Sequence, residues 1–304
     1  MEMAMIGLGK MGAGMARRLL KGGHRVVGFD LNEEAIRSTE TEGVEITRTM
    51  EDVAGKLNPP RVVWIMVPAG DPVEKTANSL SGILSPGDII IDGGNSNFRD
   101  SLCRARGLEE KGIGFIDVGV SGGVRGTDEG YCLMVGGKSD TVEKIRPILE
   151  ALAPAPDRGW GRVGPVGAGH FVKMVHNGIE YGLMEAYAEG FELMKRNKEF
   201  GLDLSAVAEI WRSGSVIRSW LLDLAAAALS ENPALEGIGA SIPDSGEGRW
   251  MVSEAIQLGC AVPVISLALQ SRFRSRDKNR FGARLITALR DEFGGHGINP
   301  KEGR

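Results

Sequence analysis

The first half of the chain alternates short apolar runs with segments of helical periodicity, and glycine or asparagine separates many of them. Short apolar runs bounded in this way are typical of strands buried on both faces of a sheet. The pattern predicts strands over residues 3–6, 24–29, 44–47, 61–67, 88–92, 114–118 and 130–135, and helices over residues 13–23, 32–41, 50–57, 72–81, 97–111 and 141–151. This alternation indicates an α/β domain with a mostly parallel sheet.

The second half has helical periodicity almost throughout. Glycines and a proline at residues 164–167 break the preceding pattern, and a long stretch without proline then predicts one helix over residues 167–197. Further helices are expected over residues 205–212, 220–230, 249–259, 262–276 and 279–293. The Pro/Gly-rich stretch 154–167 is the expected boundary, so an α/β domain of residues 1–166 would precede an all-α domain of residues 167–304.

The first predicted strand leads directly into a glycine motif. Gly7-Leu8-Gly9-Lys10-Met11-Gly12 follows this strand and opens a helix. The first glycine permits a tight turn, the second lets a pyrophosphate approach the backbone, and the third lets helix and strand pack closely. The helix N-terminus then offers its amides to the phosphates. The motif in this context predicts a Rossmann-type dinucleotide-binding domain, with all six residues at the cofactor.

An acidic residue ends the second predicted strand. Asp30 lies eighteen residues after Gly12, where a carboxylate accepts hydrogen bonds from the ribose hydroxyls of the adenosine. The same carboxylate would repel a 2′-phosphate, and the next residues, Leu31 and Asn32, include no arginine to bind one. The sequence therefore favours NAD as cofactor, with NADP as the alternative.

Polar and glycine residues follow several later strands. In an open α/β sheet the ligand binds beyond the carboxyl ends of the strands, where these loops meet. Asn95 and Ser121 offer hydrogen bonds to hydroxyls or a carboxylate, and Gly122 and Gly123 leave backbone amides bare. We expect Val67, Pro68 and Asn95 at the cofactor, and Asn95, Ser121, Gly122 and Gly123 at the substrate. Plain turn chemistry is the alternative for each residue taken singly.

The long helix carries the main catalytic candidates. At about 100° per residue, Lys173, Asn177 and Glu180 fall on one face, with His176 and Tyr181 beside it. The backbones of Lys173 and Glu180 would then lie roughly 10 Å apart along the axis, a span that suits a small sugar acid. Lysine and glutamate on one helix face usually form a solvated surface. Here the apolar surroundings and the need of a dinucleotide domain for a catalytic partner favour a functional role.

Composition narrows the class of protein. The 304 residues are 42% hydrophobic and 25% charged, with a net charge of −4, which gives no sign of a nucleic-acid or anionic-membrane partner. No segment approaches 18 uninterrupted apolar residues. The three scattered cysteines and four histidines match no disulfide framework and no metal-ligand spacing. We therefore expect no metal, and we expect a location in the reducing cytoplasm.

Several motifs together resemble a known family. They are Gly-Leu-Gly-Lys-Met-Gly at 7–12, Asp-Gly-Gly-Asn-Ser at 92–96, Val-Ser-Gly-Gly at 120–123 and Lys-Met-Val-His-Asn-Gly-Ile-Glu-Tyr at 173–181. The chain is similar over essentially its whole length to the 6-phosphogluconate dehydrogenases, among the β-hydroxyacid dehydrogenases. The first three motifs are shared by the broad superfamily. The fourth motif and the Phe-Gly-Gly-His tail are more specific to the phosphogluconate branch.

This resemblance implies an activity and a site. The reaction would be oxidative decarboxylation of 6-phosphogluconate to ribulose 5-phosphate and CO2 with reduction of NAD, a step of the pentose phosphate pathway and of gluconate utilisation. Lys173, Asn177 and Glu180 would be catalytic, with neutral Lys173 as the base and Glu180 as the acid that protonates carbon 1. The substrate-binding residues implied by the resemblance are Asn95, Ser121, Gly122, Gly123, His176, Asn177, Tyr181, Arg272, Arg290 and His296.

Departures from the long members of the family are informative. This chain has one copy of a helical region that the long members duplicate, so it resembles the short bacterial type. The resemblance then implies a homodimer or homotetramer whose C-terminal tail brings Arg290 and His296 to the phosphate of a neighbouring subunit. Arg274 is the alternative to Arg272 at the phosphate. Glu247 stands where the long members have a threonine, which leaves the phosphate pocket less closely matched.

Two rival functions stay open on the sequence alone. One is another β-hydroxyacid dehydrogenase, such as a 3-hydroxyisobutyrate dehydrogenase, which needs a base but no second acid. The other is a non-catalytic nucleotide sensor, which needs neither. The pair of Lys173 and Glu180 favours the decarboxylating enzyme over both.

Overall fold

The computed structural model describes residues 1–294. Its backbone contacts divide the chain into two compact units, Met1–Gly178 and Ile179–Arg304. The division falls inside helix α9 (Ala168–Arg196), which confirms the helix predicted over residues 167–197. The domain boundary placed after residue 166 stays a prediction.

The first unit is built on an eight-stranded sheet with the order β3-β2-β1-β4-β5-β6-β7-β8. Its strands are β1 (Glu2–Ile6), β2 (Arg25–Phe29), β3 (Glu45–Ile46), β4 (Val62–Ile65), β5 (Ile89–Asp92), β6 (Gly114–Ser121), β7 (Cys132–Gly136) and β8 (Trp160–Gly164). Neighbours from β3 to β6 pair in parallel, β7 runs antiparallel to β6, and β8 is parallel to β7. Because the strand order reverses between β1 and β4, the carboxyl ends of these strands border the crevice where such sheets bind dinucleotides.

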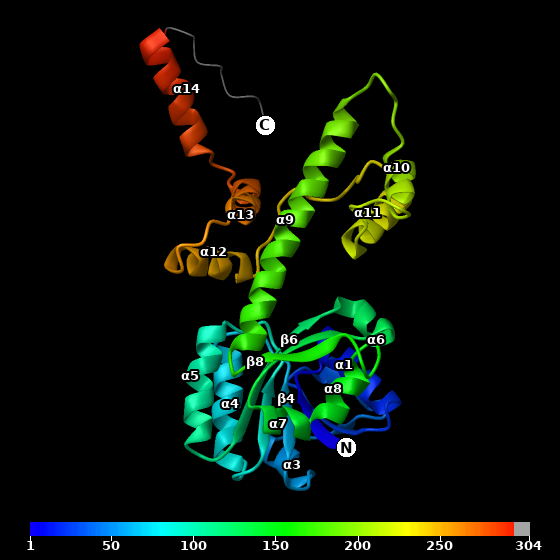
Figure 1. Ribbon diagram of the computed structural model, residues 1–304, viewed down its shortest axis with the longest axis vertical. Coiled ribbons are helices and arrows are strands. Elements are labelled where there is room, and N and C mark those ends of the chain that lie inside the picture. Colours follow the sequence, from blue (N-terminus) through cyan, green and yellow to red (C-terminus); the bar gives the residue numbers. More distant parts are fainter. Residues whose placement is uncertain (295–304) are drawn as a thin grey trace. The chain divides into compact units, whose positions relative to one another are not determined.

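Helices cover both faces of this sheet, as Figure 1 shows. They are α1 (Lys10–Lys21), α2 (Glu33–Glu40), α3 (Met50–Gly55), α4 (Asp71–Ile83), α5 (Phe98–Glu109), α7 (Ser139–Lys144) and α8 (Arg146–Leu152). Alternate residues of β1 enter different cores: Met3 and Met5 pack with α1, α7 and α8, whereas Ala4 and Ile6 pack with α3, α4 and α5. Burial on both faces explains why the strands read as continuous apolar runs.

The predicted α/β pattern differs from the structure in several places. The single helix expected over residues 141–151 is two helices, α7 and α8, which meet at Ile145. Pro147 has no N–H to donate, and its ring clashes with a preceding helical turn, so it suits the first turn of a new helix.

The Pro/Gly-rich stretch 154–167, for which no strand was predicted, contains β8. This strand pairs with β7 at the edge of the sheet, with a register irregularity at Val135/Gly136. Its sequence, WGRVG, is half-exposed and has little apolar alternation, because an edge strand on a sheet end buries few side chains. Hydrophobic periodicity therefore did not predict β8.

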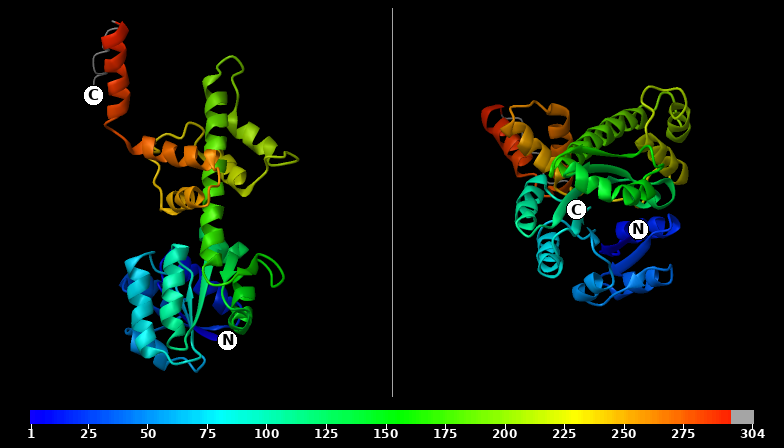
Figure 2. Two further views of the ribbon diagram at one scale, coloured as in Figure 1. Left: turned by 60° about the vertical axis from the view of Figure 1, so that its left-hand side comes forward. Right: turned by 60° about the horizontal axis from the view of Figure 1, so that its bottom comes forward.

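The second unit is helical. It holds the C-terminal part of α9 and the helices α10 (Leu204–Trp211), α11 (Trp220–Glu231), α12 (Glu247–Gln257), α13 (Pro263–Arg276) and α14 (Phe281–Gly294). Figure 2 shows α10 and α11 as a pair beside α9, and their buried residues pack with Tyr187, Phe191 and Met194 of that helix. A second small core joins Tyr181 and Met184 of α9 to α12 and α13. Helix α9 is thus the element on which the helical unit is assembled.

Across residues 1–294, no helix combines the length and apolarity needed to cross a membrane.

Candidate active site

The glycine turn between β1 and α1 is shaped for the close approach of a ligand. Gly7 has a φ of +95°, and its N–H donates to the Phe29 carbonyl over 2.8 Å. A Cβ added at Gly12 would lie 1.9 Å from the Gly7 carbonyl oxygen, whereas one added at Gly9 would meet nothing within 4 Å. The third glycine therefore lets the turn pack on the helix, and the second leaves open space over the first amides of α1. This arrangement fits the pyrophosphate of a dinucleotide.

Asp30 is held directly beside this turn. Its Oδ2 accepts the N–H of Leu8 over 2.5 Å, and its Oδ1 accepts the N–H of Asn32 over 2.7 Å. Each carboxylate oxygen keeps a further lone pair, so the fixed side chain suits a ribose diol. Lys10 is exposed at the start of α1, and Met11 is half-buried against the core.

The loops after β4 and β5 meet at the same edge of the sheet. The Val67 carbonyl oxygen would lie 3.1 Å from a Cβ added at Gly94. Pro68 and Asn95 are exposed on these two loops. The structure therefore places Val67, Pro68 and Asn95, the residues predicted at the cofactor, on two loops that meet at this edge.

A buried ion pair shapes the loop that carries Asn95. Asp92 accepts a hydrogen bond from Arg104 Nη1 over 2.8 Å, another from Ser96 Oγ over 2.7 Å and a third from Gly94 N over 3.1 Å. Because these partners come from both ends of the loop and from α5, the loop is held in one conformation.

The end of β6 meets α9 through side chains. Ser121 Oγ and His176 Nε2 lie 3.3 Å apart, and His176 Nδ1 lies 3.0 Å from Asn177 Oδ1. Gly122 and Gly123 have positive φ values of 133° and 54°, and the space around Gly123 is open. A short 3-10 turn η1 (Gly123–Arg125) and helix α6 (Gly126–Glu129) follow, where the sequence suggested only a glycine loop.

Lys173 lies on the face of α9 that packs on the sheet. Its side chain is 7% exposed. A Cβ added at Gly119 of β6 would lie 2.4 Å from the Lys173 Cβ, so helix and strand are in direct contact there. The structure thus groups Lys173, His176, Asn177 and Ser121 in the first unit.

Glu180 belongs to the second unit but to the same helix as Lys173. Seven residues separate them, which is close to two helical turns, so their backbones lie roughly 10 Å apart along the axis. Glu180 is half-buried. Both residues therefore lie on α9 with the spacing that the sequence predicts, and their roles stay predictions.

A buried guanidinium marks the candidate phosphate end in the second unit. Arg272 on α13 is 5% exposed, and its Cζ lies 3.6 Å from the centroid of the Tyr181 ring. Its Nε is buried and meets no hydrogen-bond acceptor within the described residues. Arg274, the alternative, is exposed, as is Arg290 on α14. The last predicted phosphate ligand, His296, lies outside the described residues.

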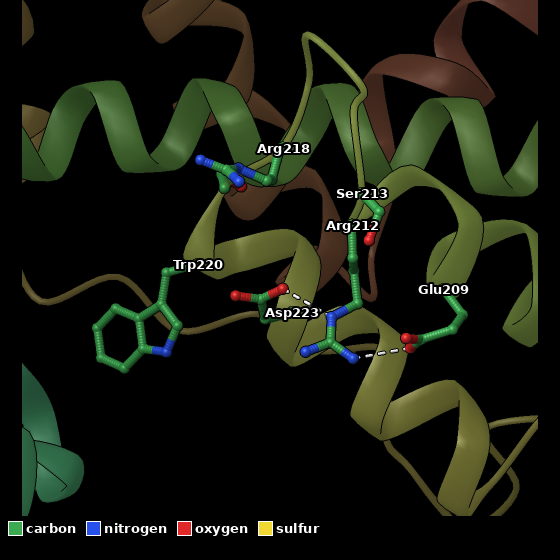
Figure 3. A pocket seen from close by; sticks show the side chains of 7 residues that line it. Glu209, Arg212, Ser213, Arg218, Trp220 and Asp223 are labelled. Atoms are coloured by element: carbon green, nitrogen blue, oxygen red, sulfur yellow. Dashed lines mark hydrogen bonds and ion pairs between the residues drawn. The ribbon is translucent and has the colours of Figure 1, made fainter.

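A separate open pocket of about 550 Å³ lies at α10 and α11 (Figure 3). Its lining residues are Glu209, Arg212, Ser213, Arg218, Ser219, Trp220 and Asp223. Arg212 donates to Asp223 over 2.8 Å and to Glu209 over 2.7 Å. These hydrogen bonds, first with Asp223 and then with Glu209, raise the pKa of Arg212. Its charge is already matched by two carboxylates, and the pocket holds none of the predicted site residues.

Three buried polar residues near the site were not predicted from the sequence. They are Asp117, His170 and Arg104, the last of which donates to Asp92. One signal was available for Asp117, since a carboxylate inside the apolar run FIDVGV is unusual for a buried strand. Arg104 lay in a helix with many exposed charges, so its burial had no sequence signal.

Comparison with known proteins agrees with these observations. Residues 2–163 match the NAD binding domain of 6-phosphogluconate dehydrogenase, and residues 186–303 match the 6-phosphogluconate dehydrogenase C-terminal domain. A Bacillus subtilis (strain 168) protein named putative 6-phosphogluconate dehydrogenase YqeC is 41% identical over 99% of this chain and 100% of its own length. The Haloferax volcanii 6-phosphogluconate dehydrogenase named NAD(+)-dependent and decarboxylating is 42% identical, with the same coverage of both chains.

A solved structure is also similar. The Plasmodium falciparum 6-phosphogluconate dehydrogenase superposes with a TM-score of 0.83 at 28% identity, covering 100% of this chain and 67% of the longer one. Both family matches and full-length identities above 40% place the sequence in one group. The chain belongs to the 6-phosphogluconate dehydrogenase family, and its first domain is the NAD-binding domain of that family.

Proposed function

We propose that this enzyme catalyses the oxidative decarboxylation of 6-phosphogluconate to ribulose 5-phosphate and CO2, with NAD as the preferred cofactor. The observation that carries the proposal is the placement of Lys173 and Glu180 two turns apart on α9, with Lys173 buried against β6. A base and a second acid at this spacing suit a reaction that removes one proton and later delivers another. A simple hydroxyacid oxidation needs only the first.

The roles of the chain's own residues follow from their chemistry. Bound NAD supplies the acceptor for the hydride that leaves carbon 3. Neutral Lys173 takes the proton of the carbon-3 hydroxyl, which leaves a 3-keto acid that loses CO2. The Lys173 ammonium then stabilises the enediolate oxygen, and Glu180 delivers a proton to the carbon that lost CO2, which is carbon 2 of the substrate and becomes carbon 1 of ribulose 5-phosphate. Each proton therefore has a named donor or acceptor on α9.

The remaining polar groups around Lys173 would orient the sugar acid. Ser121, His176 and Asn177 form a hydrogen-bonded row beside Lys173. Asn95 and the bare amides of Gly122 and Gly123 would add contacts to hydroxyls and the carboxylate. Fixing the substrate at several points is what converts a modest base into an effective one.

The phosphate of the substrate would bind at the guanidinium of Arg272, beside Tyr181. Burying the Arg272 guanidinium costs free energy, because its Nε has no hydrogen-bond acceptor among the described residues. A bound phosphate would accept that hydrogen bond and offset the cost. Arg290 and His296 would add to this phosphate site. The same arrangement is not needed for an unphosphorylated hydroxy acid.

Asp30 supports NAD over NADP. Its two backbone hydrogen bonds fix the carboxylate beside the glycine turn, where a 2′-phosphate would meet like charge.

We also propose a homodimer or homotetramer. Helix α14 exposes Phe281, Leu285, Ile286 and Leu289 at helical spacing, which is typical of a face that another chain covers. Arg290 follows on the same helix. If this face packs on a neighbouring subunit, Arg290 would lie near that subunit and could bind the phosphate of its substrate. Sedimentation across a dilution series would test this, and a monomer at every concentration would contradict it.

A cytoplasmic location belongs to the same proposal. Cys103, Cys132 and Cys260 are exposed and unpaired, and such thiols persist in a reducing compartment. Cell fractionation would test the location.

The first experiment measures initial rates at the absorbance band of reduced nicotinamide. The purified enzyme receives 6-phosphogluconate with NAD and then with NADP, and 3-hydroxyisobutyrate serves as the control substrate. We expect reduction with phosphogluconate, faster with NAD. Faster reduction with NADP would keep the activity and contradict the role of Asp30, and reduction with the control acid alone would support the rival dehydrogenase.

A further inference from the structure

A buried carboxylate on β6 binds the start of the helix that carries Lys173. Asp117 is fully buried. Its Oδ1 accepts the N–H of Gly167 over 2.6 Å, and its Oδ2 accepts the N–H of His170 over 2.9 Å. Gly167 immediately precedes α9 and His170 lies in its first turn, where the amides have no partner within the helix and carry partial positive charge. The carboxylate therefore caps α9 from the sheet.

The same strand contacts α9 at two further points. Residues 117, 119 and 121 lie on one face of β6, because side chains alternate along a strand. Gly119 touches Lys173, and Ser121 lies against His176. The contacts follow in the same order along both elements. From Asp117 to Ser121 the strand spans about 13 Å, and from residue 167 to residue 176 a helix spans about 13.5 Å, so the two lengths match.

Glycines bring α9 and the sheet so close together that the helix cannot shift along the strand. A Cβ added at Gly169 would lie 2.4 Å from the Asp117 carbonyl oxygen and 2.5 Å from that of Met134. A Cβ added at Gly136, which pairs with Asp117 across β6 and β7, would lie 2.5 Å from the Asp117 carboxylate. The helix thus rests on the sheet backbone itself. A slip of one residue would turn Lys173 by about 100° away from the strand.

A side-chain hydrogen bond also holds the first turn of α9. His170 is almost fully buried, and its Nδ1 lies 2.7 Å from Ser101 Oγ on α5. The first turn of α9 is therefore tied to β6 by its backbone and to α5 by a side chain.

We propose that Asp117 is a positioning residue for Lys173. It sets the axial and rotational position of α9 and so aims the Lys173 amine, without contact with substrate or cofactor. The proposal rests on the assignment of Lys173 as the base in the proposed function. Removing the cap would leave the glycine turn and Asp30 intact while loosening the helix start.

The test uses Asp117→Ala and Asp117→Asn in the full-length enzyme. Asp88 provides the control, because it too is a buried carboxylate that accepts two backbone N–H groups, from Arg61 over 2.7 Å and Ser85 over 2.9 Å. Asp88 also pairs with Arg61 Nη1 over 3.1 Å, so its replacement tests a loss at least as large as that of two backbone hydrogen bonds. It precedes β5, at the opposite end of that strand from Asp92. Asp88→Asn therefore reports the general cost of removing a buried carboxylate from this sheet.

We expect Asp117→Ala to lower kcat by about 100-fold, the order of effect that a misplacement near 1 Å causes, with the Kd of NAD unchanged. Asp117→Asn should recover part of the loss, because its Oδ1 still accepts one of the two N–H groups. Amide hydrogen exchange should become faster in residues 165–176 and stay unchanged in β1 and β4. Asp88→Asn should lower the melting temperature but leave kcat at the wild-type value below that temperature.

Equal kcat losses in the Asp117→Asn and Asp88→Asn enzymes would overturn the proposal, as would unchanged exchange in residues 165–176. The asparagine variant keeps the test decisive if the alanine variant does not fold. Lys173→Met separates this idea from the proposed function. An active Lys173→Met enzyme contradicts the base assignment, whereas an inactive one beside a fully active Asp117→Asn enzyme contradicts only the role of Asp117.

Discussion

The guanidinium of Arg272 lies over the ring of Tyr181, with its Cζ 3.6 Å from the ring centroid. A stacked guanidinium keeps the N–H groups in its plane directed sideways, where a phosphate can accept them. We expect Arg272→Met to raise the KM for 6-phosphogluconate by roughly 10- to 100-fold, since a charged hydrogen bond contributes about 1.5–3 kcal/mol. Steady-state kinetics would measure it. Arg274→Met decides between the two arginines, and a larger KM effect there would contradict the choice of Arg272.

Lys173 is the expected base. Replacement by methionine keeps a long apolar chain in a buried position but removes the amine. We expect Lys173→Met to lower kcat by at least about 100-fold, within the range of general-base effects, and to leave the Kd of NAD unchanged. Fluorescence titration with NAD beside the rate assay would separate the two. Lys195→Met, at an exposed position of the same helix, is the control and should keep full activity.

Glu180 should act after the oxidation. In Glu180→Gln the carbon-1 protonation lacks its acid, so we expect rapid formation of about one reduced nicotinamide per site and then a steady rate about 100-fold below wild type. Stopped-flow absorbance would resolve the two phases. The exposed Glu189 of α9 supplies a matched Glu→Gln control. A normal steady rate in Glu180→Gln would favour simple oxidation of a hydroxy acid.

Asp30 should decide the cofactor. The double substitution Asp30→Asn with Leu31→Arg removes a carboxylate and adds a cation at a strongly exposed position. We expect the ratio of kcat/KM for NAD to that for NADP to fall by at least about 100-fold, because one repulsion of the 2′-phosphate is removed and one attraction is added. Rates with both cofactors at saturating phosphogluconate would show it. An unchanged ratio would mean that selectivity lies elsewhere.

His24 should make stability depend on pH. It is buried after α1, and burial lowers its pKa below the ordinary 6.5, with a further lowering from the charge of the amino terminus. A depressed pKa means that the folded state disfavours the protonated ring. The contribution is therefore complete above pH 6.5 and is lost as the pH falls toward the folded-state pKa.

We expect the free energy of unfolding to fall between pH 7.5 and pH 5, and to fall less in His24→Gln. Urea unfolding at both pH values would measure the difference. Equal slopes for the two proteins would show that other groups govern acid unfolding.

The fold was predictable where local chemistry and tertiary packing agree. Apolar runs covered on both faces by helices gave the strands, and the Gly7–Gly12 spacing gave the turn that the structure confirms. Strand β8 was missed because the edge of a sheet does not require apolar side chains. The break at Ile145 was missed because the helical periodicity continues across Pro147 although its backbone cannot.

The residues of the candidate site also fall into those that the sequence predicted and those that needed the structure. The face of α9 with Lys173 and Asn177 follows from helical spacing alone. Asp117 did not follow, because its partners are backbone amides fifty residues or more away along the chain, and no spacing rule relates them. The burial of Arg272 and the exposure of Arg274 also needed the structure, since two arginines two residues apart differ only in which side of α13 is covered.

The division of the chain between Gly178 and Ile179 separates the two expected proton-transfer groups, with Lys173 on one side and Glu180 on the other. Neither unit, produced as an independent fragment, would contain a complete set of reactive side chains. An assay for turnover therefore also reports whether α9 is continuous. A protease that cleaves within that helix should abolish catalysis even where the fragment with the glycine turn still retains its dinucleotide.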